Sequence, residues 1–354
     1  MDTMLALVKE SPELGLTLKE VPVPTPLDDE VLIETKAIGI CGSDVHVYNW
    51  SGGYEFMESL MPIIPGHEYS GQIVKVGKDV TRFKPGDRVV VKYTVECGQC
   101  VNCRTGRRFL CSEGSKNNNG FRKNGGFAKY SVQKEDGCVP LPDNVSYEQG
   151  ALVEPMSVTS NAVAKAQLLF GDVVVVLGPG PIGLLTLMFA RASGAGTCIM
   201  VGTSQDHSRL ELAKDMGADY VFTSDTVDIK EKVMEITDGN GADVIFEATG
   251  VSALIQDCLD MLTQVGKLVC ISIYGKVATL ELNNFVRGAQ TMMGTYAGGP
   301  VTWERILRWL ASNDYYAKQG IKVVTHTSNI KESDEAFARC NAKENIKELF
   351  TSFE

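Results

Sequence analysis

The sequence predicts an α/β protein of two domains, one a barrel-like assembly of short β-strands and the other a doubly wound parallel sheet. Three observations lead to this prediction. At 354 residues the chain is too long for one ordinary hydrophobic core, so two domains are expected. Residues 1 to about 150 read as short strands separated by Pro and Gly. From Asp172 onward, strands alternate with helices.

The first domain is expected to consist of short strands arranged as a barrel. Its strand-like runs are LTLKEV, VLIETKAIG, SGQIVKVG, DRVVVKY and FAKYSV. Pro and Gly punctuation such as VPVPTP and KPGD separates these runs. Regularly spaced short strands of this kind indicate a barrel-like β domain.

The second domain is expected to alternate strands and helices. Strands are predicted for DVVVVLG, TCIMVG, DVIFEATG, KLVCISIYG and TMMGTY. Helices are predicted for PIGLLTLMFARASG, for His207 to Met216 and for the region near Ser252 to Leu262. This alternation is the pattern of a doubly wound parallel sheet. After Tyr296, VTWERILRWLAS reads as an amphipathic helix, and KVVTHTSNIKESDEAFARC as a strand followed by a helix.

The turn after the first strand of this domain has the spacing of a dinucleotide-binding loop. VVVVLGPGPIG places Gly178, Gly180 and Gly183 as G-x-G-x-x-G between an apolar strand and a helix. Such glycines allow a tight turn, close approach of the backbone to a pyrophosphate and tight helix packing, while the helix N-terminus holds the anion. A glycine-rich turn that binds nothing is the alternative, and the strand and helix alternation that follows disfavours it.

The charge and the N-terminus restrict the partners and the compartment. Thirty-four Lys and Arg against 44 Asp and Glu give a formal net charge of -10, so neither nucleic acid nor a membrane is expected as a partner, and a small molecule is. The N-terminus fails as a signal peptide and no apolar run reaches membrane-spanning length, so a cytoplasmic location is expected. In that reducing compartment the ten cysteines are not expected to form disulfides.

Four cysteines lie close together and predict a closed metal site. They follow the spacing C-x2-C-x2-C-x7-C and are Cys97, Cys100, Cys103 and Cys111. A ferredoxin-type cluster would need a shorter last step and a Pro where Ser112 stands, so zinc is favoured. Four thiolates fill a tetrahedral ion, which predicts a structural role. Four free thiols are the alternative, and the polar segment GQCVNCRTGRR disfavours it.

A second set of metal-binding side chains is spread along the chain. ICGSDVH supplies Cys41, PGHEYSG supplies His67 and Glu68, and LVEPMSV supplies Glu154. A thiolate, an imidazole and carboxylates suit a zinc with an exchangeable position, which is the arrangement that catalysis requires. Each residue alone also has a structural interpretation, as a core thiol, a turn histidine or a surface charge.

The order of motifs over nearly the whole chain resembles the zinc-dependent medium-chain dehydrogenases, particularly polyol dehydrogenases of the sorbitol dehydrogenase type. The motifs are CGSD, GHEYSG, KPGDRV, the four-cysteine segment, GGFAKY, PDNVSYEQGALVEP and GPGPIG. The resemblance implies a GroES-like β-barrel catalytic domain at residues 1–155, completed by residues 291–354, with a Rossmann domain inserted at 156–290. It also implies a homo-oligomer, which we expect to be a tetramer.

The resemblance also assigns the metal ligands. Cys41, His67 and Glu68 match the family's catalytic zinc positions. Glu154 matches the acidic residue that lies at or next to the metal in the polyol branch, so either this carboxylate or water is the fourth ligand. With the four-cysteine site, two zinc ions per chain are expected.

Three more residues gain roles from the resemblance. Ser43 and His46 match the family's proton relay, and Asp44 matches the acidic residue buried beside the zinc site. The physical logic agrees, since zinc lowers the pKa of a bound hydroxyl and a hydroxyl followed by an imidazole can lead the released proton to solvent. Asp44 would orient a metal ligand.

The expected reaction is hydride transfer between a secondary alcohol, a polyol or sugar alcohol oxidised to a ketose, and a nicotinamide cofactor. Tyr48, Trp50 and Tyr54 offer ring and hydroxyl contacts for such a substrate. Ala297 and Gly298 stand where sorbitol-type enzymes carry an Arg-Tyr pair, which disfavours sorbitol itself and a phosphorylated sugar held at that point. The alternatives are an L-threonine 3-dehydrogenase-like enzyme, a general secondary-alcohol dehydrogenase and, disfavoured by the intact motifs, a binding protein without catalysis.

The end of the second Rossmann strand favours NADP(H) slightly over NAD(H). NAD-specific folds place an acidic residue at this point, where Gly202 stands. The hydroxyls of Thr203 and Ser204 and the charge of Arg209 suit a phosphate. The alternative is that Asp206 folds back and accepts a hydrogen bond from the ribose. The expected cofactor-binding residues are Gly178, Gly180, Pro181, Ile182, Gly183, Gly202, Thr203, Ser204, Arg209 and Thr249.

Overall fold

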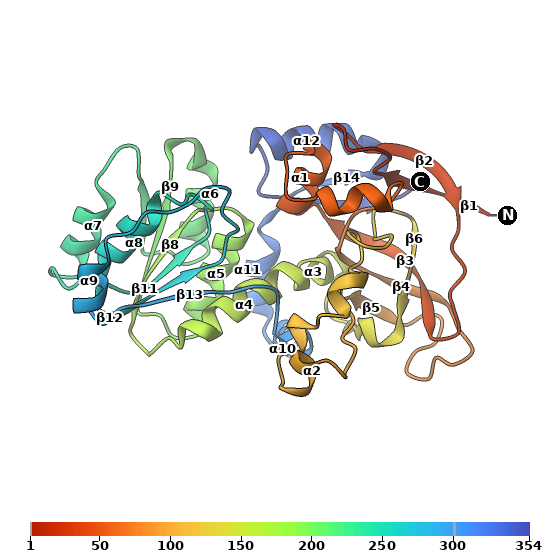
Figure 1. Ribbon diagram of the computed structural model, residues 1–354, viewed down its shortest axis with the longest axis horizontal. Helices are drawn as coiled ribbons and strands as arrows, with labels where there is room; N and C mark the ends of the chain where they lie inside the picture. The colour runs from red at the N-terminus through yellow and green to blue at the C-terminus, as the bar shows by residue number, and fades with distance from the viewer. Residues whose placement is uncertain (1, 300–301) are drawn as a thin grey trace. The chain divides into compact units, whose positions relative to one another are not determined.

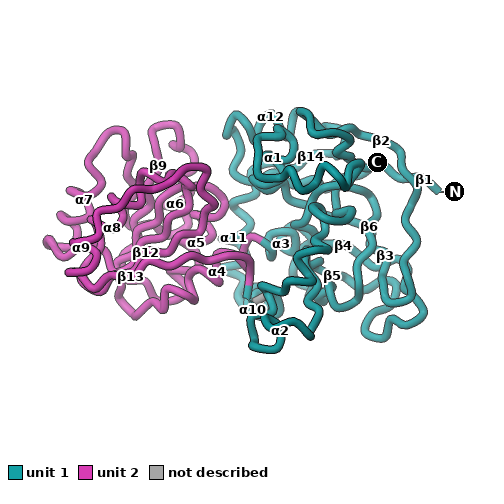
Figure 2. Tube along the Cα trace, viewed as in Figure 1, with its two compact units in different colours: residues 1–154, 299–354 teal, residues 155–298 magenta. Residues whose placement is uncertain are grey.

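The computed structural model describes residues 2–299 and 302–354, and the chain divides into two compact units. The first unit contains residues up to 154 and from 299 onward, and the second contains 155–298 (Figures 1 and 2). One unit is thus inserted in the sequence of the other, in the expected order. The second unit extends past the expected boundary at 290 because the strand Thr291–Gly294 pairs within its sheet.

The first unit is built on a seven-stranded sheet of order β14-β15-β3-β4-β5-β7, in which β6 also pairs with β3. Strands β1 and β2 form a separate antiparallel pair. The strands of this unit are β1 (Thr3–Val8), β2 (Thr17–Pro22), β3 (Glu30–Gly39), β4 (Glu68–Val76), β5 (Arg88–Val91), β6 (Tyr130–Lys134), β7 (Cys138–Pro140), β14 (Val324–Asn329) and β15 (Lys347–Ser352). The β-rich character predicted for this part of the chain is confirmed.

Short helices surround this sheet. The α-helices of the first unit are α1 (Gly42–Asn49), α2 (Val101–Arg104), α3 (Tyr147–Ala151), α10 (Thr302–Ser312), α11 (Asp314–Ile321) and α12 (Ser333–Ala342). Its 3-10 turns are η1 (Glu55–Leu60), η2 (Arg108–Leu110), η3 (Gly114–Asn117), η4 (Glu135–Gly137) and η6 (Ile330–Glu332). Helix α4 (Val153–Ala166) carries the chain into the second unit. None of the helices in 2–299 and 302–354 is long and apolar enough to cross a membrane.

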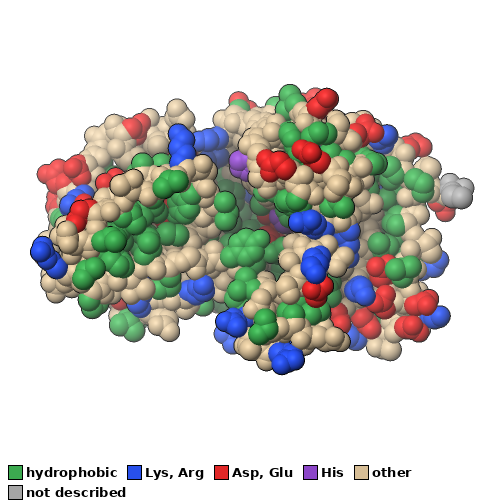
Figure 3. Space-filling model, in the orientation of Figure 1, with side chains coloured by type: hydrophobic (Ala, Val, Ile, Leu, Met, Phe, Trp, Pro, Cys, Tyr) green, Lys and Arg blue, Asp and Glu red, His purple; other side chains and the backbone are tan. Residues whose placement is uncertain are grey.

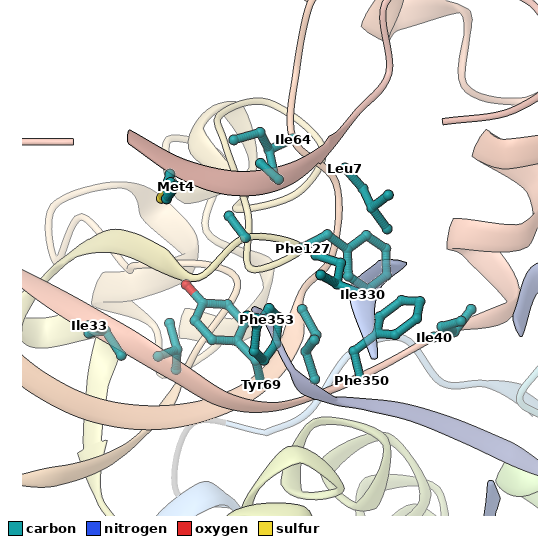
Figure 4. Close-up of a cluster of buried hydrophobic side chains, with 14 of the residues drawn as sticks. Met4, Leu7, Ile33, Ile40, Ile64, Tyr69, Phe127, Ile330, Phe350 and Phe353 are labelled. Carbon is teal, nitrogen blue, oxygen red and sulfur yellow. The ribbon is translucent and has the colours of Figure 1, made fainter. Parts of the chain in front are cut away.

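The core of the first unit draws on both ends of the chain. Figure 4 shows Met4 and Leu7 of β1 in one cluster with Tyr69 of β4, Phe127 and Phe350 of β15. The rings of Phe127 and Phe350 lie 5.7 Å apart at an interplanar angle of 82°, an edge-to-face contact that favours both rings. Residues after 299 therefore complete a hydrophobic core that the first 154 residues begin.

The second unit has a six-stranded parallel sheet of order β10-β9-β8-β11-β12-β13, as predicted. Its strands are β8 (Val173–Leu177), β9 (Thr197–Gly202), β10 (Tyr220–Thr223), β11 (Ala242–Glu247), β12 (Leu262–Cys270) and β13 (Thr291–Gly294). Its helical segments are α5 (Pro181–Ala192), η5 (Ser204–Asp206), α6 (His207–Asp215), α7 (Ile229–Ile236), α8 (Leu254–Met261) and α9 (Leu282–Arg287).

Side chains alternate across this sheet because successive residues of a strand face opposite sides. Val175 of β8 and Ile199 of β9 are buried in one cluster with Val233 of α7 and Leu259 of α8. Helices α5 and α6 contact the strands β8, β9 and β10. The chain order reverses between β8 and β11, which are neighbours, and dinucleotides bind at such a point in doubly wound sheets.

Candidate active site

A thiol, an imidazole and a carboxylate meet in the first unit. Cys41, His67 and Glu68 each offer a ligand atom, and these atoms lie within 4.8 Å of one another. The sheet brings them together: Cys41 closely follows β3, Glu68 begins β4, and the antiparallel register places Glu68 opposite Gly39. This group of three, predicted from scattered motifs, is therefore a direct consequence of the pairing of β3 with β4.

Asp44 lies beside this group and is fully buried. Its Oδ2 accepts a hydrogen bond from the backbone N–H of Cys41 at 2.9 Å, which fixes the start of α1. Its Oδ1 lies 3.5 Å from Nδ1 of His67. Burial would lower the pKa of His67, but the negative charges of Asp44 and Cys41 raise it well above the ordinary value. The pocket thus attracts positive charge, either a proton or a metal cation.

Glu68 has a buried cationic partner that the sequence patterns did not predict. Lys347, the first residue of β15, forms an ion pair with Glu68, and its Nζ donates a hydrogen bond to the carbonyl of Ile40 at 3.0 Å. Burial lowers the pKa of Lys347, but the charge and hydrogen bond of Glu68, together with the charges of Cys41 and Asp44, outweigh this effect, so the pKa is raised overall. The close approach needs Gly39, because a Cβ there would meet Cε of Lys347 at 2.8 Å.

Glu154 lies near the three ligands, outside the 4.8 Å group. It is in the first turn of α4 and is buried. Burial raises its pKa to about 7, with the charge of Glu68 adding to the rise and that of His67 opposing it. A carboxyl group with such a pKa can exist in both protonation states near neutrality.

The two predicted relay residues lie one turn apart on α1, with different exposures. The Oγ of Ser43 is buried and makes no hydrogen bond with the residues that the structure describes. His46 is exposed, and its Nδ1 lies 2.7 Å from Oγ of Ser51. The structure therefore places a hydroxyl on the inner side and an imidazole on the outer side of the same short helix.

An aromatic wall adjoins the metal-ligand group. The ring of Phe121 lies 4.7 Å from that of His67, and the ring of Tyr54 lies 6.0 Å from Phe121. Burial, together with the charges of Cys41 and Asp44, raises the pKa of Tyr54 to about 12, so its hydroxyl remains protonated. Phe121 was missed from the sequence, since only its proximity to His67 reveals it.

The other two aromatic residues that were predicted to contact substrate have different neighbours. Tyr48 stacks on Phe337 with ring centroids 4.4 Å apart. The ring of Trp50 lies under the ammonium group of Lys9, at 5.2 Å. Of the three, Tyr54 is the one with a described contact to the metal-ligand group and its wall.

The four predicted zinc thiols gather in a second cluster, all within 4.8 Å of one another. The sulfurs of Cys97 and Cys103 are 3.9 Å apart, and so are those of Cys100 and Cys111. A tetrahedral zinc with bonds of about 2.3 Å requires sulfur separations of about 3.8 Å, whereas a disulfide needs about 2 Å. The cluster thus fits a closed zinc site.

The backbone around these thiols favours thiolates. The N–H of Gly114 donates to Sγ of Cys111 at 3.1 Å, and the N–H of Cys100 donates to Sγ of Cys97 at 3.3 Å. Hydrogen bonds from backbone N–H groups lower the pKa of Cys100 to about 5. Burial raises the pKa of Cys103 to about 12, so a bound cation would be needed to ionise this thiol near neutrality.

In the second unit, the glycine turn has the geometry of an anion-binding loop. Gly178 has a φ of +97° and directly follows β8, and Pro181 opens α5. A Cβ at Gly183 would overlap the carbonyl of Gly178, whereas a Cβ at Gly180 would meet nothing within 4 Å. Open space therefore faces the backbone at the N-terminus of α5, whose first turn contains Pro181 and Ile182. A bound pyrophosphate requires such space.

The turn after β9 uses its hydroxyl groups internally. Asp206 accepts hydrogen bonds from the backbone N–H and the hydroxyl of Thr203, at 3.0 and 2.8 Å, and lies 3.3 Å from Arg209. Ser204 donates to Asp225, from its backbone N–H at 2.8 Å and from its hydroxyl. The Asp206 carboxylate is thus turned toward Thr203 and Arg209, and its role as an acceptor for the ribose stays a prediction.

The comparisons with known proteins agree with this geometry. Residues 27–143 match the alcohol dehydrogenase GroES-like domain, and residues 181–312 match the zinc-binding dehydrogenase domain. The chain is 37% identical to a sorbitol dehydrogenase of Halalkalibacterium halodurans over 98% of this chain and 99% of that one. It is 33% identical to an L-threonine 3-dehydrogenase of Pyrococcus horikoshii, over 99% of each chain.

A solved structure shows the same architecture. The 2R,3R-butanediol dehydrogenase of Bacillus subtilis superposes with a TM-score of 0.87 at 30% identity, covering 98% of this chain and 99% of that one. The predicted fold class, a GroES-like domain with a Rossmann domain, is confirmed by the matched domains and this likeness. The chain belongs to the zinc-dependent medium-chain dehydrogenases, NAD(P)-dependent oxidoreductases, in the branch similar to the polyol dehydrogenases.

Proposed function

We propose that the protein oxidises a secondary alcohol of the polyol type to a ketone at the Cys41, His67 and Glu68 site. The observation that carries this proposal is the gathering of three ligand atoms within 4.8 Å, at buried or half-buried residues whose neighbours include the hydroxyl groups of Ser43 and Tyr54. A simple aliphatic alcohol would leave such groups without partners, whereas a hydroxylated chain can bond to them.

The ligand set suits a zinc ion held by a thiolate, an imidazole and a carboxylate. When bound, zinc would lower the pKa of the substrate hydroxyl and the nicotinamide would accept the hydride. Asp44 holds His67 in place. The buried Oγ of Ser43 accepts the released proton while its own hydroxyl proton leaves toward His46, so the serine stays neutral. His46 on the exposed side of α1 passes a proton to water. Glu154, with its pKa near 7, is placed to exchange a hydrogen bond with substrate or solvent.

A substrate panel tests this proposal. The zinc-loaded protein should turn over xylitol, arabitol and butane-2,3-diol with kcat/KM at least about tenfold above that for ethanol, because its polar groups favour hydroxylated chains. Nicotinamide absorbance measures the rates, with a chelator-treated sample as control. Turnover confined to primary alcohols or to L-threonine would overturn the polyol assignment. L-threonine is the second candidate substrate because a relative that matches over 99% of each chain is an L-threonine 3-dehydrogenase.

We propose NADP(H) as the preferred cofactor, because β9 ends in Gly202 and not in an acidic residue, and because the nearby Asp206 carboxylate is paired with Thr203 and with Arg209 of α6. Arg209→Leu should lower kcat/KM for NADP by about tenfold and that for NAD by less than about twofold, since a charge-assisted bond to the phosphate is lost. Lys214→Leu, another cation of α6, is the matched control and should change neither value.

A tenfold preference of the wild-type protein for NAD, about 1.4 kcal/mol, would contradict this proposal. An equal loss of kcat/KM for NADP and NAD in Arg209→Leu would also contradict the proposal. It would show that Arg209 acts only through its ion pair with Asp206, which supports the turn. Gly202→Asp is a poor test, because a Cβ at this position would meet Cγ of Pro179 at 2.9 Å.

We propose that the protein forms a homo-oligomer, a tetramer by family resemblance. Figure 3 shows hydrophobic side chains gathered on the second unit, and the exposed ones include Ile273, Val277, Leu282, Val286 and Met292. Strand β13 is also an edge of its sheet, with unpaired backbone groups. Light scattering should give a multiple of the chain mass, and the double substitution Leu282→Lys and Val286→Lys should reduce it. A monomeric wild-type protein at assay concentration would refute the proposal.

A further inference from the structure

Glu247, the last residue of β11, is a buried carboxylate held by neutral donors. It is 0% exposed. Its Oε1 accepts hydrogen bonds from the backbone N–H groups of Thr249 at 2.6 Å and Gly250 at 3.1 Å, and from the Thr249 hydroxyl. Its Oε2 accepts a hydrogen bond from the Tyr274 hydroxyl at 2.5 Å. No ion pair among the described residues includes Glu247.

These hydrogen bonds join two segments at the carboxyl edge of the parallel sheet. Thr249 and Gly250 follow β11, and Tyr274 follows β12. The turn of Thr249 also abuts the glycine loop, because a Cβ at Gly178 would meet Cγ2 of Thr249 at 3.0 Å. Since β8 and β11 flank the point where the chain order reverses, this turn borders the crevice where a dinucleotide binds.

The position in the sheet indicates which half of the cofactor the turn serves. Doubly wound folds bind the two nucleotides on the two halves of the sheet, and β11 to β13 form the second half. The adenine nucleotide belongs with the half formed by β8, β9 and β10, because the glycine turn and the ribose-binding position follow β8 and β9. The turn held by Glu247 therefore borders the nicotinamide nucleotide.

The charge of Glu247 remains effective at this place. Hydrogen bonds from donor groups stabilise the charged form of a carboxylate, and the carboxylate of Glu247 accepts four of them. Burial and the charge of Glu247 raise the pKa of Tyr274, so the phenol stays a neutral donor. Neutral donors stabilise the carboxylate but do not cancel its charge, and a charge in a weakly polar interior acts over several ångströms.

We propose that Glu247 is a positioning residue that orders the nicotinamide side of the cofactor site and favours the oxidised cofactor over the reduced one. The oxidised nicotinamide ring carries a positive charge and the reduced ring carries none, so a nearby buried anion stabilises only the oxidised form. The inference rests on the proposed nicotinamide site. It adds a charge effect to that site, which the glycine turn alone does not supply.

The test compares dissociation constants of the two forms. In the full-length zinc-loaded protein, Glu247→Gln keeps the shape and removes the charge, so it should weaken binding of NADP+ by about tenfold and that of NADPH by less than about threefold. Titration calorimetry measures NADP+, and nucleotide fluorescence measures NADPH. Tyr274→Phe keeps the charge and removes one donor, so it should weaken both forms by the same factor.

Two further results make the outcome unambiguous. Glu247→Asp keeps the charge on a shorter side chain and should leave the ratio of the two dissociation constants within about twofold of wild type. If Glu247→Gln fails to fold, Glu247→Asp replaces it as the informative variant. A change of the ratio by about twofold or more in Glu247→Asp would then count against the inference. Equal weakening of both forms by Glu247→Gln would overturn the charge effect while the proposed function stands. A wild-type protein that binds neither nucleotide would overturn the proposed function itself.

Discussion

Replacing Cys41 with Ser should lower kcat/KM for alcohol oxidation by at least about a thousandfold while leaving nucleotide affinity within about twofold. Serine can replace the thiol in capping α1, so the helix that carries Ser43 and Asp44 should form as before. Its hydroxyl is a far weaker zinc ligand than a thiolate, so His67 and Glu68 alone would have to hold the ion. The loss should therefore appear in the chemical step.

Metal content separates this result from a loss of fold. The wild-type protein should hold two zinc ions per chain, one at each cluster, and Cys41→Ser should hold one, measured by atomic emission. Cys340→Ser, a half-buried thiol outside both clusters, is the matched control and should retain both ions and full activity. Full activity in Cys41→Ser, or one zinc in a fully active wild-type protein, would contradict the assignment of the site.

Replacing Lys347 with Met should lower the free energy of unfolding of the zinc-free protein by about 3–5 kcal/mol, because it leaves the buried Glu68 carboxylate without its cation. Asp44 and Cys41 add negative charge to the same pocket, which increases the cost. Urea unfolding followed by tryptophan fluorescence measures this effect in the first unit alone, because all three tryptophans, Trp50, Trp303 and Trp309, lie there.

Two variants control this measurement. Lys75→Met removes an exposed cation of β4 and should change the free energy of unfolding by less than about 0.5 kcal/mol. Adding Glu68→Gln to Lys347→Met removes the unpaired charge and should recover part of the lost stability. If the Lys347→Met protein is as stable as the Lys75→Met protein, Lys347 does not compensate the buried negative charge of Glu68.

The parts of the molecule that could be predicted well are those that depend on residues close together in the sequence. The glycine turn with the strand before it and the helix after it spans only the 20 residues from Val173 to Ala192, and the parallel sheet follows from repeated local patterns. The four-cysteine cluster is likewise local, since spacing alone limits which ions it can hold. Scattered ligands such as Cys41 and His67 needed the family resemblance as well.

The features that were missed depend on contacts between distant segments. Lys347 reaches Glu68 only because β15 pairs with β3, across about 300 residues of sequence. No local pattern distinguishes this lysine from the many exposed ones. The same holds for Phe121, which lies beside His67. It also holds for Glu247, which is notable because it is buried and forms no ion pair with the described residues.

The completion of the first core by Phe350 has a consequence for synthesis on the ribosome. Strand β15 emerges only after residues 155–298 have been made, so the end of β3 at Ile38 and Gly39 must wait for β15, whereas β4 and β6 can already flank the rest of β3. The inserted unit has its whole sheet in one continuous stretch and can fold as soon as it has left the exit tunnel. The unit begun second is thus finished first, and until then the nascent chain leaves unpaired the edge of β3 at Ile38 and Gly39, where β15 will add.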